Sequence, residues 1–192
     1  PSKQNASWVN EDQILIGADF GEGSMNESGY PMQVKLWNRG EPLEEAKIFF
    51  SGSYKKIFNF PFVSIRPDGK YYGIIEGPTF FSEVLHLFDG EKLIKINLPQ
   101  MIDIHGFFNE SLILSIEEDW GIFKSGSLLE INVNSLLANS IDESDVKIIF
   151  EPDGQRFISG VSIGKHQLMV SMLENVNGII TRFLKKDDRW DS

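Results

Sequence analysis

The sequence contains one motif associated with nucleophilic catalysis, a G-x-S-x-G pattern at residues 160–164 with Ser162 at its centre. In α/β-hydrolases this serine lies on a sharp turn from a strand into a helix, which exposes its hydroxyl beside an oxyanion hole. Here residues 165–171 favour a hairpin turn and a second strand, so we expect Ser162 in mid-strand. His166 is only four residues away, whereas a triad needs a base folded back from elsewhere and an acid to orient it. We therefore predict no catalytic residue in this chain.

One acidic loop could hold a metal ion. Asp19, Glu22, Asn26 and Glu27 lie among glycines, and hard cations bind carboxylate and carbonyl oxygens. The spacing does not match the calcium loop of an EF-hand. A solvated loop between two strands explains the same residues, and we predict no metal here.

The remaining candidate ligands are scattered. His86, His105 and His166 occur singly, and none has a second ligand at metal spacing. The absence of cysteine from the sequence excludes disulfides, thiolate metal sites and a cysteine nucleophile. We predict no bound cofactor.

Two further runs of residues can be interpreted as structural, and for the first of them a binding role is also possible. Phe58, Phe60 and Phe62 alternate at the period of a strand, which fits either a ligand-stacking platform or one buried face of a sheet. The mixed-charge run 185–189 is predicted to be a surface turn.

The elements that must position these residues are short strands. Runs of β-branched and aromatic residues alternate with turn signals such as Asp-Gly, in which glycine supplies the positive φ of a tight hairpin. Only residues 134–140 suggest a helical turn, with Asn134 and Ser135 as possible caps. We predict strands over 13–17, 33–37, 46–50, 71–76, 83–88, 93–97, 102–107, 111–116, 127–132, 146–150, 158–163, 167–173 and 178–184, with turns at 67–70, 89–90, 109–110, 152–154 and 164–165.

The strands fall into groups that repeat roughly every 45 to 50 residues, with three or four strands in each group. Four-stranded units at this period are typical of propeller blades, whereas a β-sandwich would not group its strands at a fixed period. The sequence therefore predicts an all-β fold, a β-propeller fragment of about four blades of antiparallel strands. The expected blades are residues 1–50, 51–99, 100–150 and 151–192 of one partial propeller domain.

Composition limits the partners. A formal net charge of -10 disfavours binding to nucleic acid or to anionic lipid surfaces, because neutralised phosphates dominate such affinities. No apolar run approaches the ~18 residues of a membrane span, so we expect no membrane contact. The composition does not distinguish a cytoplasmic from a periplasmic protein. The chain starts at Pro1, and we interpret both termini as the boundaries of a piece of a longer protein.

Two blocks of the sequence are distinctive: residues 8–31, WVNEDQILIGADFGEGSMNESGYP, and residues 34–43, VKLWNRGEPL. They resemble the propeller of bacterial members of the prolyl oligopeptidase family of serine peptidases. The family pattern is a strand, Gly-x-Asp-Phe-Gly-x-Gly-Ser, then Ser-Gly-Tyr-Pro and a Trp-x-Arg-Gly-x-Pro-Leu turn. Residues 119–129 and 158–177 are similar in order and spacing, while 51–99 are generic, and the loop between Asp119 and Gly126 is shorter than in the family.

This resemblance implies a parent protein with two domains. One is a seven-bladed propeller that restricts entry to short peptides, and the other is an α/β-hydrolase domain with a Ser-Asp-His triad that cleaves after proline. The present chain would be about four of the seven blades, and the missing hydrolase domain and short peptide substrates would be its partners. The alternative is a stand-alone propeller that acts as a binding scaffold.

The predicted strands also imply a core and a mode of assembly. Alternating residues should point into the packing between sheets: Ile14, Ile16, Val34, Leu36, Leu112, Leu114, Ile116, Leu129, Ile131, Leu168 and Val170. A fragment of a propeller ring leaves its two end blades uncovered, so we expect self-association through these blades, sensitive to Ile179→Asp or Phe183→Asp. The competing outcome is a monomer whose end blades curl together.

Overall fold

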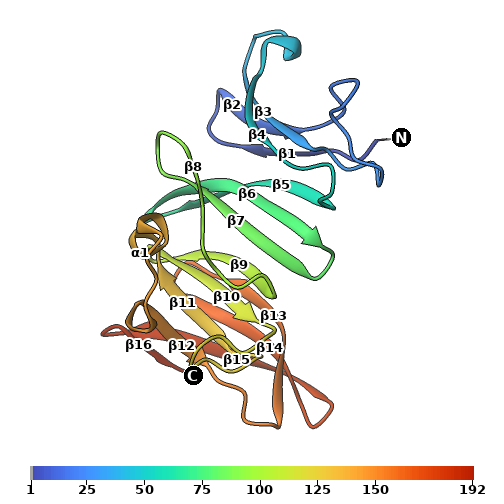
Figure 1. Cartoon of the computed structure of the whole chain (residues 1–192). Helices are drawn as coiled ribbons and strands as arrows, with labels where there is room; N and C mark the ends of the chain where they lie inside the picture. The colour runs from blue at the N-terminus through green and yellow to red at the C-terminus, as the bar shows by residue number, and fades with distance from the viewer. Residues whose placement is uncertain (1) are drawn as a thin grey trace. The chain divides into compact units, whose positions relative to one another are not determined.

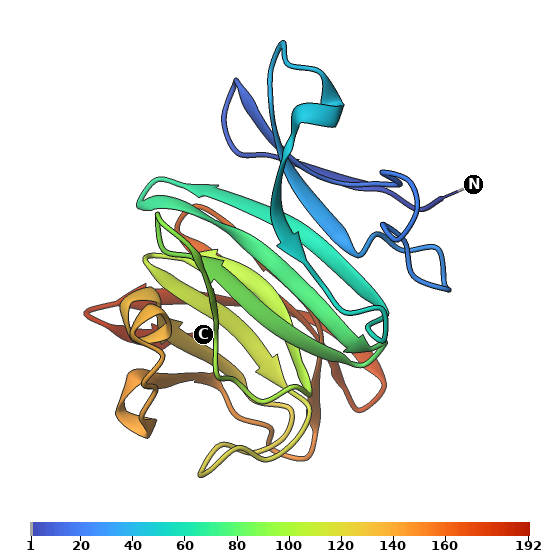
Figure 2. The ribbon, with the colours of Figure 1, turned by 45° about the horizontal axis from the view of Figure 1, so that its top comes forward.

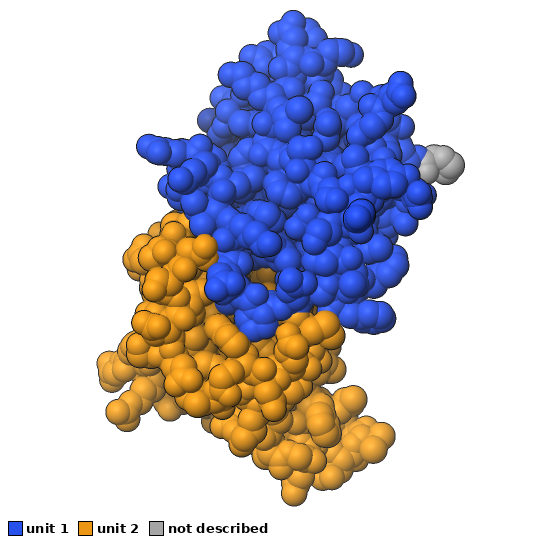
Figure 3. All heavy atoms as spheres, in the orientation of Figure 1, with its two compact units in different colours: residues 1–65, 70–100 blue, residues 66–69, 101–192 orange. Residues whose placement is uncertain are grey.

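The computed structural model describes residues 2–192, which form sixteen strands in four antiparallel sheets of four strands each. Within each sheet the strands are hydrogen-bonded in chain order. The predicted all-β fold of antiparallel four-stranded units is confirmed. Contacts divide the chain into two compact units, residues 1–65 with 70–100 and residues 66–69 with 101–192 (Figure 3).

Unit 1 contains the first two sheets (Figure 1). The first consists of β1 (Asn5–Trp8), β2 (Gln13–Gly17), β3 (Gln33–Asn38) and β4 (Lys47–Ser51), with a 3₁₀ turn at Leu43–Glu45 before β4. The second consists of β5 (Phe58–Arg66), β6 (Gly69–Thr79), β7 (Ser82–Phe88) and β8 (Leu93–Lys95). Their shared core is a cluster of Val9, Leu15, Val34 and Ile74.

Unit 2 contains the other two sheets (Figures 1 and 2). One consists of β9 (Ile102–Phe108), β10 (Ser111–Ile116), β11 (Leu128–Asn132) and β12 (Val146–Phe150), with helix α1 (Val133–Ala138) and a 3₁₀ turn (Glu143–Asp145) between the last two strands. The other consists of β13 (Arg156–Ile163), β14 (Gln167–Glu174), β15 (Asn177–Lys186) and β16 (Arg189–Asp191). The two sheets bury one cluster: Phe108, Ile113, Leu128, Ile149, Phe150, Leu168, Val170, Met172 and Phe183.

The predicted strands leave out β1, β5 and β16, which are all edge strands of their sheets, although the alternation of Phe58, Phe60 and Phe62 suits a strand at β5. β1 and β16 have only four and three residues, too few to show a periodic pattern. β5 contains Pro61, which lacks the N–H that a central strand needs, and the edge position is what tolerates it. Each missed strand completes a set of four.

The predicted core is confirmed at eight positions: Val34, Leu112, Leu114, Ile116, Leu129, Ile131, Leu168 and Val170 are all buried. In β2 the predicted phase is wrong. Leu15 is fully buried, and it lies opposite Leu36, which is partly buried against the same cluster. Ile14 and Ile16 therefore lie on the other face of the sheet and are half-buried. Three consecutive apolar residues gave no alternation from which to choose the phase.

Two smaller predictions are corrected. The N-cap of α1 is Asn132, whose side chain accepts a hydrogen bond from the Asn134 N–H, so Asn134 and Ser135 lie inside the helix. Ile179 and Phe183 point into the unit 2 core, so they cannot form the exposed face of the last sheet. Phe183 pairs with buried Leu168, which fixes its side of the sheet.

Candidate functional site

The G-x-S-x-G motif lies in β13 and the turn after it. Ser162 is exposed and pairs with Met169 in β14. The Gly164 N–H donates to the Gln167 carbonyl over 2.9 Å, which closes a β-hairpin where a nucleophile elbow would start a helix. His166 is exposed in the same turn. The hydroxyl of Ser162 therefore lacks the strand-to-helix turn that activates such a serine.

The acidic loop uses its polar groups to hold its own backbone. Asp19 Oδ1 accepts hydrogen bonds from the Gly21 N–H and the Ser24 hydroxyl. The buried amide of Asn26 donates to the carbonyls of Lys56 and Ile57, over 2.8 and 2.7 Å. Among residues 2–192, no three His, Cys, Asp or Glu side chains lie close enough together to hold a metal ion. No helix in that range is long and apolar enough to cross a bilayer.

The aromatic run on β5 is a partly exposed ladder. Phe58 and Phe60 stack with ring centroids 4.5 Å apart, and the Tyr30 ring meets Phe60 edge-on at 6.0 Å. Phe58 and Phe62 are half-buried, and Phe60 is exposed. The buried-face interpretation is therefore wrong, and the ligand-stacking interpretation stays a prediction.

A cavity of about 280 Å³ in unit 2, lined by polar and apolar side chains, is the strongest candidate site. Its lining comes from β9, β10, the loop before β11, and the segment from Pro152 into β13. β9 and β13 are the first strands of neighbouring sheets within this unit. The residues around the cavity are Asp103, His105, Ser115, Glu117, Ser125, Gly126, Pro152, Arg156, Phe157, Ile158, Ser159 and Gly160.

Two β-bulges shape this cavity. In β9, Ile104 pairs with Leu114 and Gly106 with Ile113, so His105 is an extra residue without a partner in β10. In β13, Ile158 pairs with Met172 and Gly160 with Ser171, which leaves Ser159 as the extra residue. A bulge bends its strand and re-aims the extra side chain. Both extra residues line the cavity.

His105 connects the polar groups on one wall. Its Nε2 lies 3.0 Å from the hydroxyl of Ser115, and its Nδ1 lies 3.9 Å from Asp103 Oδ2. Ser115 and Asp103 are directly opposite each other in the β9–β10 register. Burial lowers the pKa of His105, and the charge of Asp103 only partly opposes this, so the imidazole is neutral at pH 7.

This serine, histidine and aspartate arrangement differs from a catalytic triad. The 3.9 Å separation exceeds hydrogen-bond distance, so Asp103 does not orient the imidazole as a triad acid does. Ser115 is 5% exposed within a strand whose six residues are all buried, so little of its hydroxyl faces the cavity. The cavity is therefore suited to binding through hydrogen bonds and charge.

The only guanidinium in the cavity lining is already paired. Arg156 Nε lies 2.9 Å from Asp153 Oδ2. The backbone N–H groups of Gln155 and Arg156, followed by the Arg156 side chain, lower the pKa of Asp153 to about 2. Because Asp153 stays ionised, it neutralises Arg156. The carboxylates of Asp103 and Glu117 then dominate the charge of the cavity.

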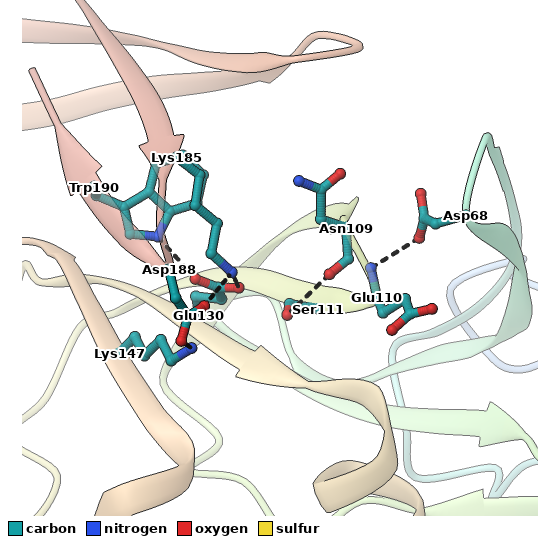
Figure 4. A network of polar contacts seen from close by, with 9 residues as sticks. All are labelled: Asp68, Asn109, Glu110, Ser111, Glu130, Lys147, Lys185, Asp188 and Trp190. Atoms are coloured by element: carbon teal, nitrogen blue, oxygen red, sulfur yellow. Dashed lines mark hydrogen bonds and ion pairs between the residues drawn. The ribbon is translucent and has the colours of Figure 1, made fainter.

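Unit 2 also contains a buried ion pair between its two sheets (Figure 4). Glu130, on β11, is 1% exposed and accepts hydrogen bonds from Lys185 Nζ at 2.5 Å and Trp190 Nε1 at 2.8 Å. Desolvation alone would lower the pKa of Lys185, but the hydrogen bonds and charges of Glu130 and Asp188 together outweigh it and raise that pKa. Lys185 belongs to the run that was predicted to be only a surface turn. This pair is therefore a structural anchor that sequence reasoning missed.

His105 and Ser115 were also missed as members of a site. The sequence showed His105 as an isolated histidine, and Ser115 as one residue in an apolar run. No local pattern marks a bulge at position 105, because a bulge is defined by the register with the next strand.

Comparisons of sequence give two similar curated proteins. An uncharacterized peptidase of Rickettsia prowazekii is 24% identical over 194 residues, covering 96% of this chain and 27% of that protein. An uncharacterized peptidase of Sinorhizobium fredii is 25% identical over 202 residues, covering 99% of this chain and 28% of that protein. The chain thus spans a little over a quarter of the length of these relatives. No family model matches it.

Solved structures share the fold. A post-proline cleaving enzyme from Rickettsia typhi superposes with a TM-score of 0.85 at 24% identity, over 98% of this chain and 29% of that one. A prolyl endopeptidase structure superposes with a TM-score of 0.67 at 12% identity, over 97% of this chain and 30% of that one. By sequence similarity and fold together, the chain corresponds to a fragment of the propeller region of prolyl endopeptidase-like proteins.

Proposed function

We propose that this chain is a non-catalytic propeller segment of a prolyl oligopeptidase-like serine peptidase. In the whole protein it would help to restrict a hydrolase domain to short peptides that are cleaved after proline. The observation that carries this proposal is coverage: almost the whole chain matches proteins named as peptidases, but only about 27–28% of their length. A segment that matches so little of a peptidase can be all propeller.

The chemistry of the serines supports the non-catalytic part of the proposal. Ser162 lies in a β-hairpin, and Ser115 is buried with a histidine that lacks an orienting hydrogen bond from Asp103. Neither serine combines an accessible hydroxyl with an oriented base, and acyl transfer needs both.

Activity measurements on two proteins test the proposal. The present chain should neither cleave a proline-containing chromogenic peptide nor react with a fluorophosphonate serine probe. The whole protein should do both, and it should cleave an octapeptide much faster than an unfolded protein of about a hundred residues that carries the same cleavage sequence.

Three results would contradict the proposal. Labelling of the isolated chain that disappears in Ser162→Ala or Ser115→Ala would show a nucleophile within it. Equal cleavage of the octapeptide and the long substrate would remove the gating role. A coding sequence that ends soon after the codon for Ser192 would favour the stand-alone binding scaffold.

A further inference from the structure

The unit 2 cavity is partly open to solvent and carries negative charge that no described lysine or arginine pairs with. Its volume of about 280 Å³ is at the lower end of small-molecule sites, which start near 300 Å³, so it can hold a group the size of one amino-acid residue. Asp103 and Glu117 both line it, and among residues 2–192 neither is paired with a lysine or arginine. Arg156 is held by Asp153. A ligand that enters therefore meets two free carboxylates.

A second observation concerns buried polar groups in the same wall. The side chain of His105 is only 8% exposed, and its Nε2 lies 3.0 Å from the Ser115 hydroxyl. The 3.9 Å gap between Nδ1 and Asp103 Oδ2 is too long for a direct bond. Ser159, the extra residue of the bulge in β13, lies in the part of the lining that β13 contributes.

The walls also offer apolar surface. Phe157 is 60% exposed and lies beside Ile158 and Pro152 in the lining. Carbon chains that carry a charged end commonly lie along such a surface while the charge reaches polar groups. The cavity thus has an apolar side from β13 and an acidic side from β9 and the end of β10.

We propose that this cavity binds a protonated amine of a peptide, with the ammonium group between the carboxylates of Asp103 and Glu117 and the adjoining carbon chain against Phe157. The amine can be a free amino terminus or a lysine side chain, because both present the same charged donor. This inference is separate from the proposed peptidase role, since the binding needs only the chain described here.

Calorimetric titration of the isolated chain tests the proposal with three peptides of the same length. One has a free amino terminus and no basic residue, one is acetylated and contains a single lysine, and one is acetylated and neutral. Either cationic peptide should bind, and the neutral one should not bind. Which cationic peptide binds more tightly identifies the source of the amine.

Variants locate the site. Asp103→Asn and Glu117→Gln should each weaken binding about 10-fold or more, as expected when one charge-assisted hydrogen bond is lost. Asp187→Asn is the matched control, because Asp187 is an exposed carboxylate in the β15–β16 turn outside the cavity, and it should bind as the parent chain does. The His105 imidazole NMR signals should shift on binding in the parent chain and in Asp187→Asn.

The proposal is overturned if neither cationic peptide binds at millimolar concentration, or if the neutral peptide binds equally well. It is also overturned if Asp103→Asn with Glu117→Gln keeps the affinity of the parent chain. Asp103 and Glu117 are exposed, so these substitutions should leave the fold intact, and an unchanged urea midpoint confirms this for each variant.

Discussion

His105 occupies its place in the cavity because β9 has one residue more than β10 at that point. Because this extra residue does not follow the alternation of side chains along the strand, its ring can reach the Ser115 hydroxyl and form a hydrogen bond with it. Asp103 and Glu117 line the same cavity, and Arg156 in the lining is paired with Asp153, so the neutral ring shares the cavity with two carboxylates. Its protonation should therefore affect both stability and binding.

The lowered pKa of His105 predicts a pH dependence of stability. The folded chain holds this proton less tightly than the unfolded chain, whose histidine pKa is about 6.5. Below about pH 6.5 the unfolded state gains the proton first, so the free energy of unfolding falls as the pH falls, until the folded pKa is passed. Above that window His105 is neutral in both states and contributes no pH dependence.

Urea unfolding of the parent chain and His105→Gln at pH 7.5, 6.5, 5.5 and 5.0 measures this effect. The stability advantage of the parent over the variant should shrink between pH 6.5 and 5.0, because the variant lacks the titrating ring while His86, His166 and the carboxylates are common to both. A difference that stays constant across this range would show that His105 is not responsible.

At the scale of elements, the orientation of β2 decides which apolar residues stabilise unit 1. Leu15 is in the cluster with Val34 and Ile74, whereas Ile16 faces away from it. Leu15→Ala should cost about 2–5 kcal/mol, as for other buried leucines, and Ile16→Ala less than half of that. The urea midpoints of the two variants measure these losses of stability. If Ile16→Ala loses as much stability as Leu15→Ala, the burial of Ile16 predicted from the sequence would be correct after all.

The last two strands depend on the buried Glu130. Lys185→Met leaves this carboxylate with the Trp190 N–H but without its ammonium partner, and removal of one member of a buried pair costs about 3–5 kcal/mol. Lys186→Met is the matched control, because Lys186 meets Asp191 at 3.7 Å on the exposed side and such pairs contribute at most about 1 kcal/mol. Similar urea midpoints for the two variants would show that the Glu130 pair is not an anchor.

At the scale of the whole molecule, the first and last sheets each carry exposed apolar side chains on one face, among residues 2–192. The face of β13–β16 away from the unit 2 core carries exposed Leu173 and Ile180, and Ile180 is 68% exposed. The face of β1–β4 away from the unit 1 core carries exposed Trp8 and Ile48. Soluble monomers rarely expose an apolar patch above about 600 Å². We predict self-association through these faces, with a two-fold dimer as the simplest closed form.

Light scattering at high micromolar concentration measures this. We expect a mass near twice 21.8 kDa, and a return to the monomer mass in Ile180→Asp. Ile122→Asp is the control, because Ile122 is similarly exposed, at 65%, but lies in a loop. A parent chain that stays at 21.8 kDa would refute the dimer.

The sequence by itself determined the all-β class, most of the strands and hairpin turns, and the grouping into four-stranded units. The predicted groups held three or four strands, and β1, β5 and β16 complete the groups of three to four. The predicted features follow from contacts between residues near one another in the chain, such as the glycine of an Asp-Gly turn. The similarity to the propeller of post-proline peptidases was also readable from local motifs in residues 8–43.

Only the tertiary structure decided which face of β2 is buried, that Ile180 and not Ile179 is exposed, and that Lys185 reaches Glu130. It alone brought Asp103, His105 and Ser115 to one cavity with Ser159. The physical reason is that a side chain's face depends on strand register and bulges, which are set by hydrogen bonds to a neighbouring strand. A shift of one residue in that register moves every following side chain to the opposite face of the sheet.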